Sequence, residues 1–170
     1  GRLEALTARN PKGIILTGGP NSVYDPESPT YDRKLFELGI PVLGICYGSQ
    51  LMAYKLGGDV KTAPTSEYGH TNVTIDAPDS LIFSDVSGET QTWMSHTDYI
   101  AAVPEGFRIS AHTANCPVAA MENPEKKLYA TQFHPEVSHT KEGTKMIRHF
   151  VKDVCGCAGD WEMAAFAETT

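Results

Sequence analysis

A cysteine flanked by glycines lies where the sequence changes from strand-like to helix-like. Cys46 stands between Gly44 and Gly48, after the apolar residues 41–45 and before the helical residues 49–56. This is the strand–turn–helix context of a nucleophile elbow, in which glycines allow a sharp turn and a close approach to the sulfur. The positive end of the following helix would stabilise a thiolate. The alternative is a packed core cysteine, since free cysteine is among the most buried residue types.

A second segment offers a general base with a partner. His134 follows the strand-like residues 127–130, and Glu136 comes two positions later. Such a carboxylate can fix the imidazole tautomer and stabilise the imidazolium that forms when the ring takes a thiol proton. Alone, a His-x-Glu pair is more often a loop histidine beside a solvated glutamate. With Cys46, however, the pair predicts a Cys–His–Glu triad.

Three ordered motifs resemble those of the class I (triad) glutamine amidotransferases. They are Leu-Thr-Gly-Gly-Pro at residues 16–20, Gly-Ile-Cys-Tyr-Gly-Ser-Gln at 44–50 and Gln-Phe-His-Pro-Glu at 132–136. The resemblance covers essentially the whole chain and implies that glutamine is hydrolysed to glutamate and ammonia. In that reaction Cys46 would attack the carboxamide, and His134 would carry its proton to the departing ammonia. Water would then hydrolyse the glutamyl thioester.

The resemblance also implies residues that bind the substrate. The backbone N–H groups of Gly19 and Tyr47 would form an oxyanion hole for the tetrahedral oxygen. Gln50, about one helical turn beyond Cys46, would project on the same face as the sulfur and hold the amino acid portion of glutamine. The alternative for Gln50 is a surface position on an amphipathic helix.

A Ser-His-x-Asp segment would complete the substrate site. In relatives it contacts the α-amino and α-carboxyl groups, which assigns that role to Ser95, His96 and Asp98. Thr97 departs from the pattern, because glycine is common at this position in the family. His96 has no carboxylate at the spacing of Glu136, so we expect a binding or structural role for it.

Further segments resemble the branch of the family that aminates XMP to GMP. They are Glu-Tyr-Gly at residues 67–69, Trp-Met-Ser-His at 93–96, Cys-Pro at 116–117 and Cys-Gly-Cys-Ala-Gly-Asp-Trp at 155–161. The last resembles the lead into an ATP-pyrophosphatase domain. This branch implies a synthetase domain, in cis or in trans, that uses ATP and Mg²⁺, and a full-length homodimer.

Two alternatives remain open. Branches that serve the synthesis of anthranilate, CTP or carbamoyl phosphate share the elbow and the His-x-Glu, but should lack the motif at 155–161. A catalytically silent docking module is an alternative from another class. Retention of Cys46, His134 and Glu136 together argues against it, because a docking surface needs no triad.

Composition narrows the class of protein. The chain has 170 residues, of which 41% are hydrophobic and 21% charged, as expected for one globular domain. The net charge of −7 and the lack of a basic run argue against nucleic acid as a partner. No apolar stretch has the length of a membrane span, and no signal peptide is apparent.

The four cysteines suggest reduced thiols in a cytoplasmic protein. Cys155 and Cys157 form a Cys-x-Cys pair, but no second pair lies nearby to complete a zinc site. We therefore expect no metal and no cofactor in the glutamine-hydrolysing domain itself.

The order of elements predicts an α/β fold. We expect a mostly parallel, open twisted sheet flanked by helices, with an additional small antiparallel sheet. Strands at 13–17 and 41–45 would alternate with helices at 30–38 and 49–56, a pattern in which reactive residues gather at the carboxyl ends of strands. Strands spaced like an antiparallel meander are expected at 70–75, 91–94, 107–112, 118–122 and 129–133, followed by a helix at 141–154.

The chain divides into two parts. Residues 1–154 would form the amidotransferase domain, and residues 155–170 a linker that ends in the start of a helix. The strand, helix and strand with which the family normally begins are not in the sequence. We therefore expect these residues to be part of a longer domain.

Overall fold

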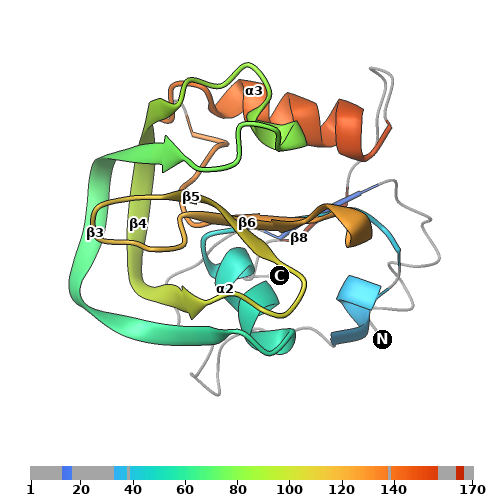
Figure 1. The fold of residues 1–170 in the computed structure, drawn as a ribbon, viewed down its shortest axis with the longest axis horizontal. Helices are drawn as coiled ribbons and strands as arrows, with labels where there is room; N and C mark the ends of the chain where they lie inside the picture. The colour runs from blue at the N-terminus through green and yellow to red at the C-terminus, as the bar shows by residue number, and fades with distance from the viewer. Residues whose placement is uncertain (1–12, 17–32, 38, 138, 157–163, 167–170) are drawn as a thin grey trace.

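The structure is a computed structural model that describes residues 13–16, 33–37, 39–137, 139–156 and 164–166 (Figure 1). Their strands form one sheet in the order β4-β3-β5-β6-β7-β2-β1-β8. The strands are β1 Ile14–Leu16, β2 Val42–Ile45, β3 Asp59–Ile75, β4 Glu89–Ala102, β5 Arg108–His112, β6 Ala120–Asn123, β7 Leu128–Thr131 and β8 Ala164–Phe166. The helices are α2 Tyr47–Lys55 and α3 Gly143–His149, with the short helices η1 Arg33–Glu37, η2 Leu81–Phe83, η3 Pro124–Lys126 and η4 Phe150–Val154.

One end of the sheet, β7-β2-β1-β8, is parallel, as the sequence predicts for the strands at 13–17 and 41–45. β2 lies between β1 and β7, and Val42 is opposite Ile14 on one side and Leu128 on the other. Every residue of β2 is buried, which is the pattern of a parallel strand covered on both faces. The α/β class is confirmed.

β7 is the strand at which the parallel and antiparallel parts meet. The sequence spacing assigned residues 129–133 to an antiparallel meander. β7 is antiparallel to β6, as expected, but it is also parallel to β2. The meander prediction was wrong on that side, because spacing along the chain does not report which strand lies at a strand's second edge.

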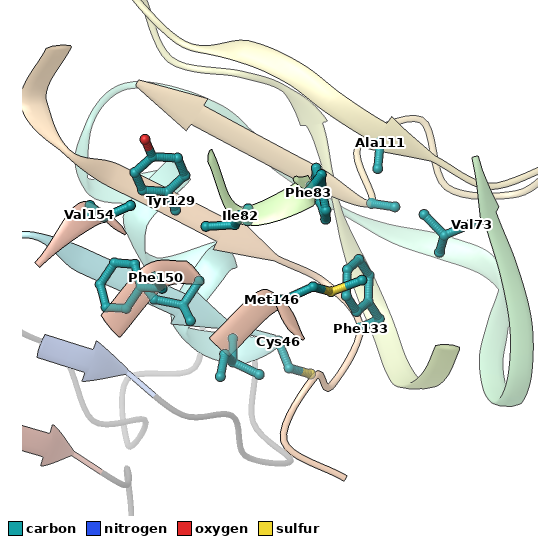
Figure 2. Packing of buried hydrophobic residues seen from close by; sticks show 14 of the residues in the cluster. Cys46, Val73, Ile82, Phe83, Ala111, Tyr129, Phe133, Met146, Phe150 and Val154 are labelled. Atoms are coloured by element: carbon teal, nitrogen blue, oxygen red, sulfur yellow. The ribbon is translucent and has the colours of Figure 1, made fainter. Parts of the chain in front are cut away.

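Alternating side chains supply a core on each face of the sheet. α2 and α3 cover opposite faces (Figure 1). Leu43 belongs to the cluster that includes Met146 and Phe150 of the α3 side, whereas Val42 packs in the cluster that includes Met52 of α2. Figure 2 shows the α3-side cluster, in which Cys46 lies at the margin near Met146 and Phe133. Cys46, the nucleophile candidate, therefore packs at the margin of a hydrophobic core.

β3 and β4 form a long antiparallel ribbon at one end of the layers (Figure 1). They contain 17 and 14 residues, so the predicted strands at 70–75 and 91–94 were too short. The ribbon pairs with β5 only through Thr74 and Ile75. It is thus the additional antiparallel element that the sequence predicts, joined to the main sheet at one end.

The helices differ from the prediction mainly at their ends. η1 lies within the helix predicted at 30–38, and α2 begins two residues before the predicted residue 49. The predicted helix at 141–154 is α3 continued by η4, a π-helical segment closed by the bond from the Cys155 N–H to the Phe150 carbonyl at 3.0 Å. No helix among the described residues is long and apolar enough to cross a membrane.

The C-terminal segment contributes a strand. Residues 164–166, for which the sequence predicted a linker and the start of a helix, form β8 and pair in parallel with β1. The helix expectation was wrong because the helix propensity of Ala164 and Ala165 is a weak preference that tertiary contacts override. The N–H and C=O groups at the edge of β1 offer these residues backbone partners instead.

Candidate active site

Cys46 occupies a strained turn between β2 and α2. Its backbone has φ 55° and ψ −109°, a region that residues other than glycine rarely adopt. A Cβ at Gly48 would collide with the backbone of Leu16 on β1, and one at Gly44 would lie 2.7 Å from the carbonyl oxygen of Gly48. The glycines are therefore required because backbone segments touch at the elbow.

Hydrogen bonds hold the strained turn in place. The N–H of Cys46 donates to the carbonyl of Thr131 at 2.8 Å, across to the end of β7. The carbonyl of Cys46 accepts from the Ser49 hydroxyl at 2.6 Å and from the N–H groups of Ser49 and Gln50. The nucleophile candidate is thus fixed at the carboxyl end of β2 and at the N-terminus of α2, whose dipole favours a negative charge there.

His134 and Glu136 meet the cysteine from the end of β7. Nδ1 of His134 lies 3.0 Å from Oε2 of Glu136, and the ring also hydrogen-bonds the side chain of Cys46. Because Nδ1 faces the carboxylate of Glu136, Nε2 is the ring nitrogen left to hydrogen-bond the sulfur of Cys46. Cys46 is 4% exposed and the His134 side chain 17%, so the sulfur is buried and solvent reaches the ring only in part. The structure brings together the three residues that the sequence assigned to a triad.

The surroundings of His134 favour its protonated form. Burial of the ring lowers its pKa, but the hydrogen bonds to Cys46 and Glu136, with the negative charges of both groups, raise it to about 10. At neutral pH the ring is therefore an imidazolium. An imidazolium beside Cys46 is the partner that a reactive thiolate requires.

The loop that carries His134 is held on the edge strand β4. The N–H of His134 donates to the carbonyl of Trp93 at 3.0 Å. The buried hydroxyl of Thr140 donates to the carbonyl of His134 at 2.5 Å and accepts from the N–H of Trp93 at 3.0 Å. This clamp fixes the imidazole relative to β4. The sequence analysis missed Thr140, because a threonine six residues after a histidine carries no motif.

Gln50 points into the site but bonds to the protein. Its Nε2 donates to the carbonyl of Asp98 at 2.9 Å and to Oε1 of Gln132 at 3.1 Å. The side chain is 3% exposed, so the alternative of a surface glutamine was wrong. Gln132 in turn places its Nε2 3.6 Å from Sγ of Cys46. The sequence analysis used Gln132 only as part of a motif and gave it no role.

Comparison with known families agrees with this geometry. The family model for glutamine amidotransferase class-I matches residues 2–154. The chain belongs to the class I glutamine amidotransferases.

Two curated relatives of this amidotransferase carry the same enzyme name. The chain is 61% identical to "GMP synthase [glutamine-hydrolyzing]" of Lachnospira eligens and 58% identical to the protein of that name from Clostridium botulinum strain Alaska E43. Each match covers 99% of the chain. The chain spans about a third of the length of these relatives, 32% and 33%.

Solved structures of other amidotransferases share the fold. A Thermoplasma acidophilum protein named for a GMP synthase subunit has a TM-score of 0.71 at 34% identity, over 85% of this chain and 73% of its own. A Thermotoga maritima glutamine amidotransferase has a TM-score of 0.74 at 20% identity, over 86% of this chain and 79% of its own.

The remaining expected ligand residues of the amidotransferase are placed unevenly. Tyr47 begins α2, so its N–H lies in the first turn, where the helix itself offers no acceptor. Ser95 and His96 lie on β4 opposite Tyr68 and Glu67, and their roles stay predictions. Gly19, Cys157 and Trp161 lie outside the described residues.

Asp98 lies on β4 beside the site. Its Oδ1 accepts from the Thr62 hydroxyl at 3.0 Å, and its carbonyl holds Gln50. Cys116 is buried and donates from Sγ to the carbonyl of Val118, as a packed cysteine would. The described residues contain no group of three or more His, Cys, Asp or Glu side chains arranged to hold a metal ion.

Proposed function

We propose that this chain is the glutamine-hydrolysing domain of a GMP synthase. It releases ammonia from glutamine through Cys46, His134 and Glu136, and the ammonia aminates XMP to GMP. The observation that carries the glutaminase part is the buried Cys46–His134 pair with its protonating surroundings. The identity to curated GMP synthases supports the choice of branch.

The first half of the reaction acylates the cysteine. The thiolate attacks the side-chain carbonyl of glutamine, and the C=O electron pair moves onto the oxygen. The N–H groups of Tyr47 and Gly19 stabilise that oxyanion; loss of one such donor raises a barrier by about 2.7–4 kcal/mol. The imidazolium of His134 then protonates the amide nitrogen, the C–N bond breaks, and ammonia leaves a glutamyl thioester.

The second half regenerates the thiolate. The neutral His134 takes a proton from water, which attacks the thioester carbonyl. The C–S bond breaks, its electron pair returns to sulfur, and glutamate leaves. Glu136 stabilises the imidazolium whenever it forms. Both Nε2 protons of Gln50 are used by the protein, so its Oε1 is the atom that would accept from the α-ammonium group of glutamine.

The full enzyme needs partners beyond the glutamine-hydrolysing domain. An ATP-pyrophosphatase domain, in cis or in trans, activates XMP with ATP and Mg²⁺, and the enzyme acts in the cytoplasm as a homodimer. The share of the relatives' length that the chain spans supports a further domain.

The decisive experiment separates the two activities in the full-length protein. In Cys46→Ala we expect no glutamine-dependent ammonia release or GMP formation, while GMP formation from added ammonium, XMP and ATP persists. Cys155→Ser, at the half-buried thiol that directly follows η4, is the matched control and should keep both activities. Undiminished glutamine hydrolysis in Cys46→Ala would refute the triad. GMP formation absent in the wild type would refute the branch.

The same experiment decides against the alternatives. A silent docking module would show no glutaminase activity in the wild type, and an electrophilic glutamine analogue would not label Cys46. An anthranilate, CTP or carbamoyl phosphate synthase would release ammonia but would leave XMP unchanged.

A further inference from the structure

A chain of buried amides ends at the sulfur of Cys46. The carbonyl of Asp98 accepts from Nε2 of Gln50, which also donates to Oε1 of Gln132, and Nε2 of Gln132 lies 3.6 Å from Sγ. Gln50 and Gln132 are 3% and 1% exposed. With so little exposure, these amides depend on protein partners rather than on water. The partners therefore determine which atom of each amide donates.

The backbone carbonyl sets the direction of every bond in this chain. A carbonyl oxygen can only accept, so the Gln50 atom facing Asp98 must be the NH₂ group. That same NH₂ can only donate, so the Gln132 atom facing it must be the oxygen. The remaining end of the Gln132 amide, the one that faces Sγ, is therefore NH₂. The polarity follows from the network and needs no observed hydrogen atoms.

The backbone of Gln132 is fixed as well. Its N–H donates to the carbonyl of Ala119 at 2.7 Å, and it directly follows Thr131, whose carbonyl holds the N–H of Cys46. The amide is thus held from its main chain and from its oxygen, and its NH₂ has little freedom to turn away from the sulfur.

We propose that Gln132 is a further catalytic residue, which donates from Nε2 to the sulfur of Cys46 and favours the thiolate over the thiol. The proposal rests on the proposed glutaminase function. Gln50 is the positioning residue, because it holds the Gln132 amide in the donating orientation.

An amide donor complements His134 because its own protonation state does not change during the reaction. His134 is protonated before attack, neutral after it has given its proton to ammonia, and protonated again once it has taken a proton from water. When water then attacks and the C–S bond breaks, the electron pair returns to sulfur. The NH₂ of Gln132 cannot lose its proton at neutral pH, so it stabilises the sulfur both before attack and during thioester cleavage.

The test measures the ionisation of Cys46 directly in the full chain. The rate of Cys46 alkylation by iodoacetamide is followed against pH by mass spectrometry of the peptide that contains it. In Gln132→Met, which keeps the length and removes the donor, we expect the midpoint of the profile to move to higher pH by about one unit and alkylation at pH values below the midpoint to slow about tenfold. Steady-state kcat for glutamine should fall at least as much.

Two further variants and a control sharpen the result. Gln132→Glu keeps the acceptor for Gln50 but turns an acceptor toward the sulfur, so its midpoint should move further than that of Gln132→Met. Gln50→Met releases the amide and should give a smaller move in the same direction. Gln91→Met, a half-buried glutamine on β4 outside the amide chain, should match the wild type.

An alkylation profile of either Gln132 variant equal to that of the wild type would overturn the proposal. A purely structural role would lower kcat or stability but leave the midpoint unmoved, and that outcome also overturns it. Failure of the proposed function looks different: the wild-type protein would then release no ammonia from glutamine. Gln132→Glu is nearly isosteric, so the test does not depend on the folding of Gln132→Met.

Discussion

At the level of single residues, the charge state of His134 is the quantity that function depends on most. Its ring lies between a sulfur and a carboxylate, and these two partners outweigh the effect of burial to raise its pKa to about 10. A ring with an ordinary pKa would lose its proton below neutral pH. The His134 ring therefore carries, at neutral pH, the proton that the departing ammonia needs.

Replacing Glu136 with Gln should lower the pKa of His134, because the carboxylate contributes both a hydrogen bond and a negative charge. The wild-type rate should fall at high pH as the imidazolium loses its proton, near pH 10. In Glu136→Gln this fall should begin at lower pH, with kcat reduced about tenfold or more at neutral pH. The measurement is the pH profile of glutamine hydrolysis.

A second histidine–carboxylate pair provides the control for that prediction. His149 and Asp153 approach to 2.8 Å on α3 and η4, away from the elbow. Asp153→Asn should leave the pH profile unchanged. If Glu136→Gln kept the wild-type profile, the carboxylate would have no influence on the reacting ring.

The sequence predicted the three triad residues but not the roles of Gln132, which contacts the sulfur of Cys46, and Thr140, which holds the carbonyl of His134. Cys46, His134 and Glu136 belong to short motifs whose chemistry can be read locally. Gln132 and Thr140 act through contacts with side chains and strands distant in sequence. The motif at 132–136 contains Gln132 but does not show that its amide faces the sulfur, and nothing in the local spacing distinguishes Thr140 from any other loop threonine.

At the level of elements, the elbow depends on how closely three backbone segments approach. β2, α2 and β1 meet at Gly48, which leaves no volume for a Cβ beside Leu16. The strained Cys46 backbone exists because these segments and β7 hold it. The sequence indicated the turn from its glycines, but not that β1 is what makes Gly48 necessary.

Gly48→Ala should displace β1 from the elbow. We expect a loss of stability of about 1–3 kcal/mol, typical of forced overpacking, and a larger loss of glutaminase activity because the oxyanion donors move. Chemical denaturation and ammonia release measure the two effects. Gly88→Ala is the matched control, since a Cβ there would meet nothing within 4 Å. Equal behaviour of the two variants would contradict the close approach.

The edge strand β4 also holds the loop that carries His134. Its backbone binds the loop 134–141 through Trp93 and through the bond from the Lys141 N–H to the Gln91 carbonyl at 3.1 Å. An open strand edge is thereby covered, and the catalytic histidine is oriented at the same time. The strand prediction for β4 was too short because polar residues interrupt its apolar alternation.

Thr140→Val should detach this loop. The N–H of Trp93 and the carbonyl of His134 would both lose their hydroxyl partner, at about 1–3 kcal/mol for a buried group left unsatisfied. We expect kcat to fall severalfold more than stability alone explains, since the imidazole loses its orientation. Thr71→Val on β3, outside the clamp, is the control. A Thr140→Val enzyme with normal kcat would show that the loop is positioned without the hydroxyl.

At the level of the whole molecule, the site is assembled from both ends of the sheet order. The elbow comes from the parallel end, while the main-chain groups of Trp93 and Asp98 that hold His134 and Gln50 come from the antiparallel ribbon β3–β4 at the other end. The sequence predicted both parts, but the sheet order follows from pairings between distant segments, which spacing does not encode. A shift of the ribbon would therefore alter the orientation of both His134 and Gln50.

This arrangement leads to a prediction for the full-length enzyme. His134 already contacts both Cys46 and Glu136 in this domain, so XMP and ATP should leave the iodoacetamide alkylation of Cys46 unchanged. Glutamine turnover should instead rise at least severalfold when XMP and ATP are present, because binding at the synthetase domain completes the substrate site around a pre-formed nucleophile. Comparing the two rates with and without XMP and ATP tests this. A parallel rise in alkylation would show that the partner creates the nucleophile, and equal glutamine turnover would show that the two sites are uncoupled.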